Sequence, residues 1–308
     1  MTRPRSSPSA GAEARARPAS PWLPPGATPP ERTVWLNGQM VRGGDASLSL
    51  FDRGARDGGG IFETVRVYAG QPFDWTRHME RLVLAAAVLG FPVPSAPSRL
   101  RHALAQVLAN EGLSDAVARL TVTRGIAGGR PTRTGAWVEA EPLTGRLWPG
   151  TRRGAATVVI SRRPFHPGPI GAFKTTSRLA YDLAREEARA ENADEALLVG
   201  ANGELYEGAV SNVFVVQRGE VLTPPLTHGI LPGIVRARVL ELCAASRIPA
   251  REAPLTRADL DSADEVFLTN SVQEIVPVGT CAARPVPHRA LADRLRDAYR
   301  GMVEKGSD

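Results

Sequence analysis

A passage rich in proline and glycine, SRRPFHPGPIGAF at residues 161–173, divides this chain into two parts that each combine strand and helix patterns. Such a passage disfavours helices and central strands, so it is typical of a boundary between domains. With 308 residues the chain is long enough for two domains, each with its own core. We therefore predict a two-domain α/β (α+β) protein. The predicted parts are a small N-terminal α/β domain at 31–150, a linker at 151–173, a larger C-terminal domain at 174–303 and a tail at 304–308.

Residues 1–30 precede the first domain and contain eight prolines together with Ser, Ala and Arg. A segment of this composition cannot bury enough apolar surface to fold, so we predict a disordered, Pro/Arg-rich extension. Its four arginines and single Glu contribute +3 of the chain's net charge of +6. The rest of the positive charge is spread among acidic residues, and no nucleic-acid-binding motif occurs, so we expect no nucleic-acid partner.

The periodicity of apolar residues predicts the elements of both domains. Two strands meet at Asn37-Gly38, a strong signal for a tight hairpin, and GIFETVRVYAGQPF at 60–73 predicts another. In the first domain we expect helices at 76–91 and 98–112 and strands at 117–125 and 135–142. In the second we expect helices at 176–192, 231–248 and 288–303, and strand pairs at 195–208, 211–225 and 264–278.

The strand pattern that starts at residue 61 has two distinct faces, because successive side chains on a strand point to opposite sides. One face carries Ile61, Glu63, Val65 and Val67, and the other carries Phe62, Thr64 and Arg66. The second face is polar for a strand flanked by helices. It is either a solvent-facing surface or part of a site, and the pattern alone leaves both readings open.

Lysine is nearly absent from this sequence. Of 38 Lys and Arg residues only Lys174 and Lys305 are lysines, and Lys305 lies three residues from the end. Arginine serves as well or better in ion pairs, but only lysine readily loses its proton and attacks a carbonyl carbon to form a Schiff base. Lys174 is therefore either a nucleophile or a lysine that survived compositional drift.

Several other classes of site find no support in the sequence. Cys243 and Cys281 lie far apart without a CxxC spacing, and the five histidines lack metal-ligand spacing, so we expect no disulfide framework and no metal. The glycines at 58–60 precede a strand, unlike the phosphate-binding loops that open a helix. No apolar run approaches the roughly 18 residues needed to span a bilayer, so we expect no membrane partner and a cytoplasmic location.

Five segments in order resemble the class IV family of pyridoxal-phosphate (PLP) enzymes, which includes branched-chain aminotransferases, D-amino-acid aminotransferases and 4-amino-4-deoxychorismate lyases. The segments are GIFETVRVYAGQPFDWTRHMERL, FKTTSRLAYDLAREEA, ADEALLVGANGELYEGAVSNVFVV, GILPGIVR and FLTNSVQEIVPV. The resemblance implies a fold-type-IV enzyme, similar to D-amino-acid aminotransferase, with pyridoxal 5'-phosphate between the two domains. It favours the nucleophile reading of Lys174.

The resemblance implies a role for three residues around the cofactor ring. Lys174 would bond covalently to the cofactor and carry protons. Glu207 would pair with the pyridine nitrogen, which must stay protonated if the ring is to withdraw electrons. Leu231 would pack on the face of the ring.

The resemblance also implies a phosphate site. Arg81 of HMERL matches the family's phosphate arginine. The amides of Ile234 and Val235 open a predicted helix, which is a favourable place for an anion. Ser271 and Val272 match a second phosphate-binding turn.

The expected reaction depends on finer resemblances. Three segments resemble the lyases more than the aminotransferases: FETVRVYAGQPF, TNSVQE and the glycine-rich TRGIAGGRP. The lyases form 4-aminobenzoate and pyruvate from aminodeoxychorismate, a step of folate biosynthesis. On this reading Thr64 is catalytic beside Phe62, and Arg66 and Arg124 hold the substrate carboxylates. The alternative is an aminotransferase for D-amino acids or branched-chain L-amino acids. Asp57 stands where relatives often have tyrosine, in a stretch that lies near the substrate side.

The resemblance further implies the partners of the chain. Members of the family are homodimers in which the partner's N-terminal domain helps to close the substrate pocket. We therefore expect a homodimer that acts on a small molecule with amino and carboxylate groups.

Overall fold

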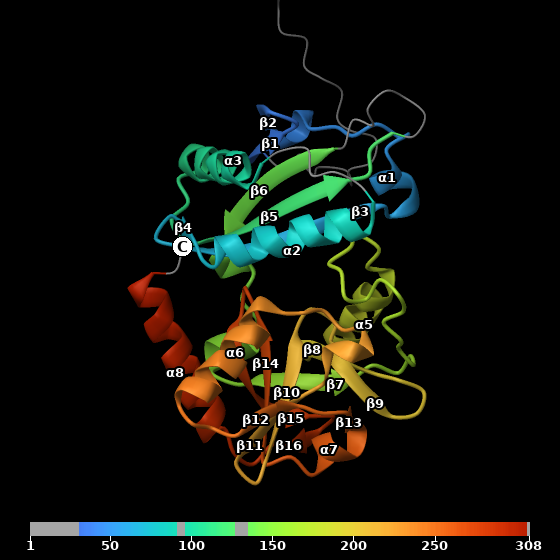
Figure 1. The fold of residues 1–308 in the computed structure, drawn as a ribbon, viewed down its shortest axis with the longest axis vertical. Helices are drawn as coiled ribbons and strands as arrows, with labels where there is room; N and C mark the ends of the chain where they lie inside the picture. The colour runs from blue at the N-terminus through green and yellow to red at the C-terminus, as the bar shows by residue number, and fades with distance from the viewer. Residues whose placement is uncertain (1–30, 91–95, 127–134, 307–308) are drawn as a thin grey trace, which may run out of the picture.

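The computed structural model describes residues 31–90, 96–126 and 135–306. It contains two sheets, each with its own helices, stacked along the long axis of the molecule (Figure 1). This arrangement confirms the predicted α/β class with two domains. The predicted extension at 1–30 lies outside the described residues.

The first domain is built on a six-stranded antiparallel sheet with the order β2-β1-β6-β5-β3-β4. The hairpin at Asn37-Gly38 and the turn at Ala69-Gly70 join neighbouring strands, and all four residues have positive φ. The strands are β1 (Thr33–Leu36), β2 (Gln39–Arg42), β3 (Gly60–Tyr68), β4 (Gln71–Pro72), β5 (Ala116–Thr123) and β6 (Ala136–Pro142).

Two long helices cover one face of this sheet (Figure 1). Apolar residues at helical spacing, such as Leu82 and Leu104, pack on inward-facing strand residues, such as Val65 and Val138. The opposite face of β3 and β5 turns toward the second domain. The helices of this part are η1 (Gly43–Asp45), α1 (Arg53–Asp57), α2 (Trp75–Val88), α3 (Pro97–Glu111) and η2 (Leu143–Gly145). The next helix, α4 (Pro149–Arg153), packs on the second domain, where the N–H of Gly150 donates to Asp194 at 2.8 Å.

The second domain has a ten-stranded sheet with the order β12-β11-β10-β14-β15-β7-β8-β9-β13, in which β16 also pairs with β15. Leu205 of β9 and Val213 of β10 belong to the same hydrophobic core, although their strands are far apart in this order. The sheet must therefore curl around its own interior. Its strands are β7 (Ala156–Ile160), β8 (Glu195–Val199), β9 (Glu204–Gly208), β10 (Asn212–Gln217), β11 (Glu220–Thr223), β12 (Ala250–Glu252), β13 (Leu255–Thr256), β14 (Glu265–Asn270), β15 (Glu274–Cys281) and β16 (Arg284–Pro285).

Helices cover the outside of this curled sheet (Figure 1). Two of them pack on the stacked rings of Phe214 and Phe267, whose centres are 4.7 Å apart, and a third covers Leu198. None of the described helices is long and apolar enough to cross a membrane. The helices are α5 (Leu179–Ala190), η3 (Leu226–His228), α6 (Ile234–Ala245), α7 (Arg257–Asp261) and α8 (Ala290–Lys305).

The structure moves two of the predicted domain boundaries. The predicted linker at 151–173 contains β7, which pairs in parallel with β8 and β15 near the middle of the second sheet. The sequence of this strand, ATVVI, is only five residues long and directly precedes the proline-rich passage, so its strand pattern is not recognised from the sequence. The tail predicted at 304–308 is helical as far as Lys305, because α8 continues beyond Val303.

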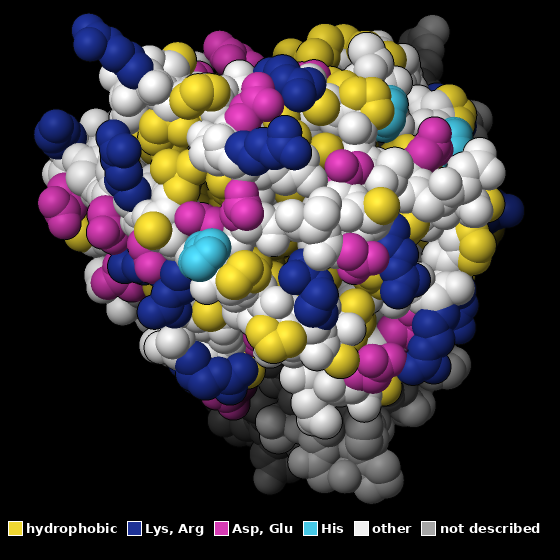
Figure 2. Space-filling model, turned by 90° about the horizontal axis from the view of Figure 1, so that it is seen from below, with side chains coloured by type: hydrophobic (Ala, Val, Ile, Leu, Met, Phe, Trp, Pro, Cys, Tyr) yellow, Lys and Arg dark blue, Asp and Glu magenta, His cyan; other side chains and the backbone are white. Residues whose placement is uncertain are grey.

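The end of the second domain that lies away from the first carries charges of both signs. Figure 2 shows basic side chains there interspersed with acidic ones and with apolar patches. Ion pairs of this domain include Arg251 with Glu220 at 2.9 Å and Arg296 with Asp293 at 2.8 Å. The visible face does not present the continuous positive surface that nucleic-acid binding uses.

Candidate active site

A cavity of about 920 Å³ lies where the two domains meet. Its walls come from strands β3 and β5 of the first domain, and from α5, β9, the start of α6 and the β14–β15 turn of the second. Among the predicted site residues, the structure brings ten to this cavity, eight of which are Phe62, Thr64, Arg81, Lys174, Glu207, Leu231, Ser271 and Val272. Ile234 and Val235 at the start of α6 line it as well.

Lys174 is fixed at the cavity by the first domain. Its carbonyl oxygen accepts the N–H of Phe62 at 2.9 Å, and the N–H of Thr176 donates to the carbonyl of Gly60 at 2.9 Å. A Cβ at Gly60 would lie 3.0 Å from the Thr176 side chain, so glycine permits this close approach. The segment after the proline-rich passage thus lies along the start of β3, with Nζ 4.9 Å from the centre of the Phe62 ring.

The amine of Lys174 is suited to reaction near neutral pH. Burial, with the charges of Arg178 and Arg81, lowers its pKa to about 7. A large fraction of the amine is therefore unprotonated at neutral pH, which both nucleophilic attack and proton abstraction require.

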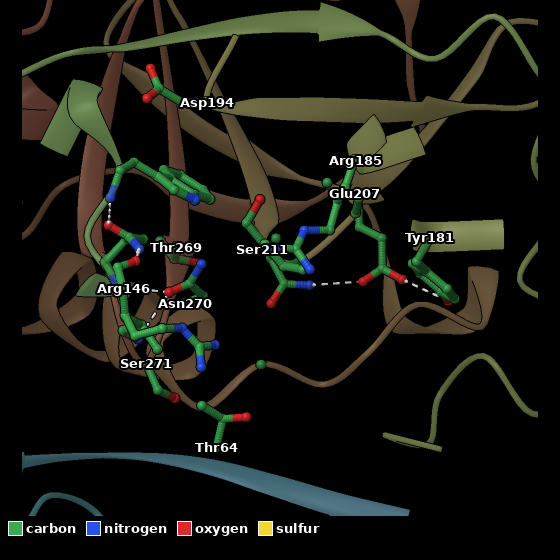
Figure 3. Close-up of a pocket in the computed structure, with 18 of the residues that line it drawn as sticks. Thr64, Arg146, Tyr181, Arg185, Asp194, Glu207, Ser211, Thr269, Asn270 and Ser271 are labelled. Atoms are coloured by element: carbon green, nitrogen blue, oxygen red, sulfur yellow. Dashed lines mark hydrogen bonds between the residues drawn. The ribbon is translucent and has the colours of Figure 1, made fainter. Parts of the chain in front are cut away.

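Glu207 lies on the far wall of the cavity, at the end of β9, and is only 4% exposed. Its carboxylate accepts the N–H of Leu231 at 3.2 Å and has a longer contact with the Asn212 amide at 3.5 Å. The Tyr181 hydroxyl lies 3.4 Å from the same carboxylate (Figure 3). Burial raises its pKa to about 7. A buried carboxylate with so few close donors would be stabilised by a cationic N–H in the cavity.

The start of helix α6 presents an anion site. Gly233 is the N-cap and supplies no side-chain cap, so the first amides of the helix, at Ile234 and Val235, face the cavity without a capping side chain. A Cβ at Gly233 would lie 1.9 Å from Oδ1 of Asn212, so only glycine fits. Arg81 from α2 lies at the same end and donates to the Pro232 carbonyl at 2.9 Å.

The β14–β15 turn differs in one respect from the expected phosphate site. Ser271 lines the cavity, but the N–H groups of Val272 and Gln273 donate to Oδ1 of Asn270 at 2.9 and 2.7 Å. The Asn side chain therefore closes the turn on itself. The Ser271 hydroxyl, rather than the Val272 amide, is the donor that this turn offers the cavity.

Two predicted substrate residues lie elsewhere. The Arg66 guanidinium donates to the Val272 carbonyl at 2.8 Å and pairs with Glu274 at 2.9 Å, so it joins the domains outside the cavity wall. Arg124 lies just beyond the end of β5, with its side chain near Gly59, and does not line the cavity either. In the described residues neither arginine lines the cavity, so their role in holding substrate carboxylates stays a prediction. Much of the glycine-rich loop that follows Arg124, at 127–134, lies outside the described residues.

Comparison with known proteins assigns the chain to a family. The family model described as "Amino-transferase class IV" matches residues 60–281, which span the cavity residues named above. The chain belongs to the class IV aminotransferase family.

Named relatives agree with this assignment. A protein of Methanocaldococcus jannaschii described as "Putative branched-chain-amino-acid aminotransferase" is 33% identical over 88% of this chain and 96% of its own length. A "D-alanine aminotransferase" of Listeria monocytogenes is 30% identical over 80% of this chain and 86% of its own. The crystal structure of a branched-chain aminotransferase from the archaeon Thermoproteus uzoniensis with norvaline superimposes with a TM-score of 0.78 at 29% identity, covering 87% of this chain and 93% of that one.

Several arginines that the sequence prediction missed also line the cavity of this class IV aminotransferase, and two of them contact aromatic side chains there. Arg119 of β5 is the register partner of Thr64, and its guanidinium lies 3.7 Å from the centre of the Phe62 ring. Arg178 stacks on Tyr181 at 3.6 Å and donates to the Ala209 carbonyl at 2.6 Å. The signal for Arg119 was a charged residue within the apolar pattern VARLTV.

Proposed function

We propose that this class IV family enzyme is a PLP-dependent aminotransferase that moves an amino group from an α-amino acid to a 2-oxo acid. The observation that carries the proposal is the placement of Lys174 and Glu207 in one cavity, with both pKa values moved to about 7. The names of the relatives support it. They favour the aminotransferase alternative over the lyase reading of the sequence.

The residues of the cavity fit pyridoxal phosphate. Glu207 would pair with the protonated pyridine nitrogen, and Leu231 would contact the ring. Arg81, the Ser271 hydroxyl and the amides of Ile234 and Val235 would hold the phosphate. When bound, the cofactor would withdraw electrons from the substrate α-carbon.

The chain's own residues would move the proton. Nζ of Lys174 would take a proton from the α-carbon of the amino acid and return it during the second half of the reaction. A pKa of about 7 allows the amine to act in both directions near neutral pH. Overall, one amino acid and one 2-oxo acid exchange their amino and oxo groups.

Arg119 would hold a carboxylate of the substrate, because it is the register partner of Thr64 on the cavity face of the first sheet. We expect Arg119→Met to lower kcat/KM about 100-fold, the effect of losing a charge-assisted hydrogen-bond pair. The visible absorbance of the bound cofactor should stay unchanged. Steady-state kinetics with the loaded variant measure this, and an unchanged kcat/KM for every donor would contradict the assignment.

Transfer assays with different donors test the proposed function. The PLP-loaded protein is given 2-oxoglutarate with L-leucine, L-valine or D-alanine, and separately aminodeoxychorismate. We expect transfer with L-leucine and L-valine first, because the M. jannaschii relative has the higher identity and coverage. Preference for D-alanine would show that the substrate specificity resembles that of the D-alanine aminotransferases instead. Rapid release of 4-aminobenzoate without transfer would contradict the proposal.

We also propose that the enzyme works as a homodimer. Leu50 and Phe51 are 84% and 66% exposed, directly before α1. The residue after α1, Gly58, accepts hydrogen bonds from Thr176 and Ser177 near the catalytic lysine. A second copy packed on this apolar segment would border the cavity. Light scattering of the purified protein should give the mass of two chains, and a mass of one chain would contradict the proposal.

A further inference from the structure

Glu63 is a buried carboxylate that the proposed mechanism does not use. It lies on β3 with 1% of its surface exposed and is not among the residues of the cavity wall. Both of its oxygens are engaged. Oε1 accepts Nε–H of Arg81 at 2.8 Å, and Oε2 accepts an N–H of the same guanidinium at 2.6 Å. Such a two-point pair fixes the orientation of the guanidinium plane.

Glu63 also reaches a second residue of the cavity through His78. Nδ1 of His78 is 2.7 Å from Oε2 of Glu63, and Nε2 is 3.5 Å from the Ser271 hydroxyl. His78 is itself buried, with 2% of its surface exposed. One carboxylate of the first domain is therefore connected to Arg81 directly and to Ser271 through a histidine.

Both connections end at turns of the second domain. Arg81 donates to the Pro232 carbonyl at 2.9 Å, directly before the N-cap of α6. Ser271 lies in the turn between β14 and β15. These are the two places in the second domain where the proposed phosphate site has its donors. Glu63 thus lies behind both halves of that site.

The charges of this cluster are consistent with its hydrogen bonds. Burial would raise the pKa of Glu63, but Arg81 and His78 lower it to about 2, so the group is a carboxylate. Burial lowers the pKa of His78 against the opposing effect of Glu63, so the imidazole is neutral at pH 7. A carboxylate beside Nδ1 places the single ring proton there, so Nε2 is unprotonated where it lies 3.5 Å from the Ser271 oxygen. The hydroxyl has one proton, which it can donate to Nε2 when no anion is bound and would turn to the phosphate when the cofactor is present.

We propose that Glu63 is a positioning residue for the cofactor phosphate: it orients Arg81 directly and the Ser271 turn through His78. The inference rests on the proposed function, since it concerns the phosphate end of the same cavity. The competing explanation is that Glu63 contributes only a charge or a contact between the domains.

The variant Glu63→Asp separates position from charge. It keeps the carboxylate but is one methylene shorter, so it cannot reach both the Arg81 fork and His78. We measure the dissociation constants of the cofactor-free protein for pyridoxal phosphate and for pyridoxal, which lacks the phosphate. We expect the preference for the phosphorylated ligand to fall about tenfold or more, while pyridoxal affinity changes little.

The matched control is Asp74→Glu, which changes a second buried carboxylate by one methylene. Asp74 is 2% exposed and pairs with Arg238 of α6 across the same domain boundary, and Arg238 does not line the cavity. We expect this variant to lower thermal stability without changing the preference for pyridoxal phosphate over pyridoxal. An equal loss of preference in both variants would show that any disturbance of the boundary has this effect, and would overturn the proposal.

Glu63→Gln keeps the size of the side chain and serves if the aspartate variant does not fold. Because each carboxylate oxygen accepts one Arg81 bond, the amide loses one of them in either orientation. If Glu63 acts by positioning Arg81, this variant should bind pyridoxal phosphate more weakly. Removal of a negative charge near the phosphate predicts tighter binding, and that result would overturn the proposal.

A double-mutant cycle tests the path through His78. His78→Asn should lower the preference for pyridoxal phosphate in the parent protein and should have little further effect after Ser271→Ala. Additive losses would contradict the relay. Failure of the parent protein to prefer pyridoxal phosphate over pyridoxal would instead contradict the proposed function.

Discussion

Replacing Lys174 with alanine is expected to abolish amino-group transfer, with a loss in kcat of at least about 10⁴-fold. Lys174 provides the only described lysine amine in the cavity, and burial holds its pKa at about 7. The neighbouring arginines cannot replace it, because guanidinium groups stay protonated in proteins. The measurement is the rate of transfer from L-leucine to 2-oxoglutarate by the PLP-loaded protein.

Two further variants make this prediction specific. Lys174→Arg keeps the positive charge and should be as inactive as the alanine variant, because arginine cannot give up a proton. Lys305→Ala removes the other lysine of the chain, which is exposed at the last residue of α8, and should retain full activity. Activity within tenfold of the parent in either Lys174 variant would show that another group does the chemistry.

Glu207→Gln is expected to lower kcat about 100-fold and, at the same time, to stabilise the cofactor-free protein. Activity falls because a neutral amide cannot hold the pyridine nitrogen in its protonated form. Stability rises because burial makes the ionised carboxylate unfavourable in the folded state. The two effects have opposite signs, which a general loss of structure would not produce.

The stability effect has a defined pH dependence. The pKa of Glu207 rises from 4.5 in the unfolded chain to about 7 in the folded protein. The folded state therefore loses stability as the pH rises through this window, and above about pH 7 the total cost is about 3 kcal/mol. Urea denaturation should show Glu207→Gln more stable than the parent at pH 8, with the gain shrinking toward pH 4.5. Equal stability of the two proteins at pH 8 would contradict the account.

Addition of pyridoxal phosphate provides the control for the Glu207 experiment. The protonated pyridine nitrogen would supply the cation that the buried carboxylate lacks. We therefore expect the cofactor to stabilise the parent protein more than Glu207→Gln, which would reduce or reverse the difference at pH 8. A cofactor effect of equal size in both proteins would show that Glu207 does not meet the ring.

Local patterns predicted much of the fold, because alternation and helical spacing report burial directly. The two faces of β3 separate as expected: Ile61 and Val65 lie in the first core, and Phe62 and Thr64 line the cavity. The strand β7 was missed because its five residues carry no turn signal that separates them from the proline-rich passage. Its place in the sheet depends on pairing with β8 and β15, which are distant in sequence.

The candidate site was less accessible from sequence than the fold. Arg66 lies on the correct face of β3, but its long side chain reaches the Val272 carbonyl and Glu274. Arg119 reaches the cavity because it is in register with Thr64, and a sequence pattern does not specify which strands pair. The Asn270 side chain accepts a hydrogen bond from the Val272 amide. The sequence TNS is compatible with this local contact but does not determine it.

A single-turnover experiment tests the central claim most directly. The PLP-loaded protein is mixed with excess L-leucine or D-alanine and no 2-oxo acid, and the products are counted against the number of chains. An aminotransferase should release one 2-oxo acid per active site and then stop, because the amino group stays on the enzyme. Addition of 2-oxoglutarate should restart turnover. Continuous product release without an acceptor, or 4-aminobenzoate and pyruvate from aminodeoxychorismate at a higher rate, would contradict the account.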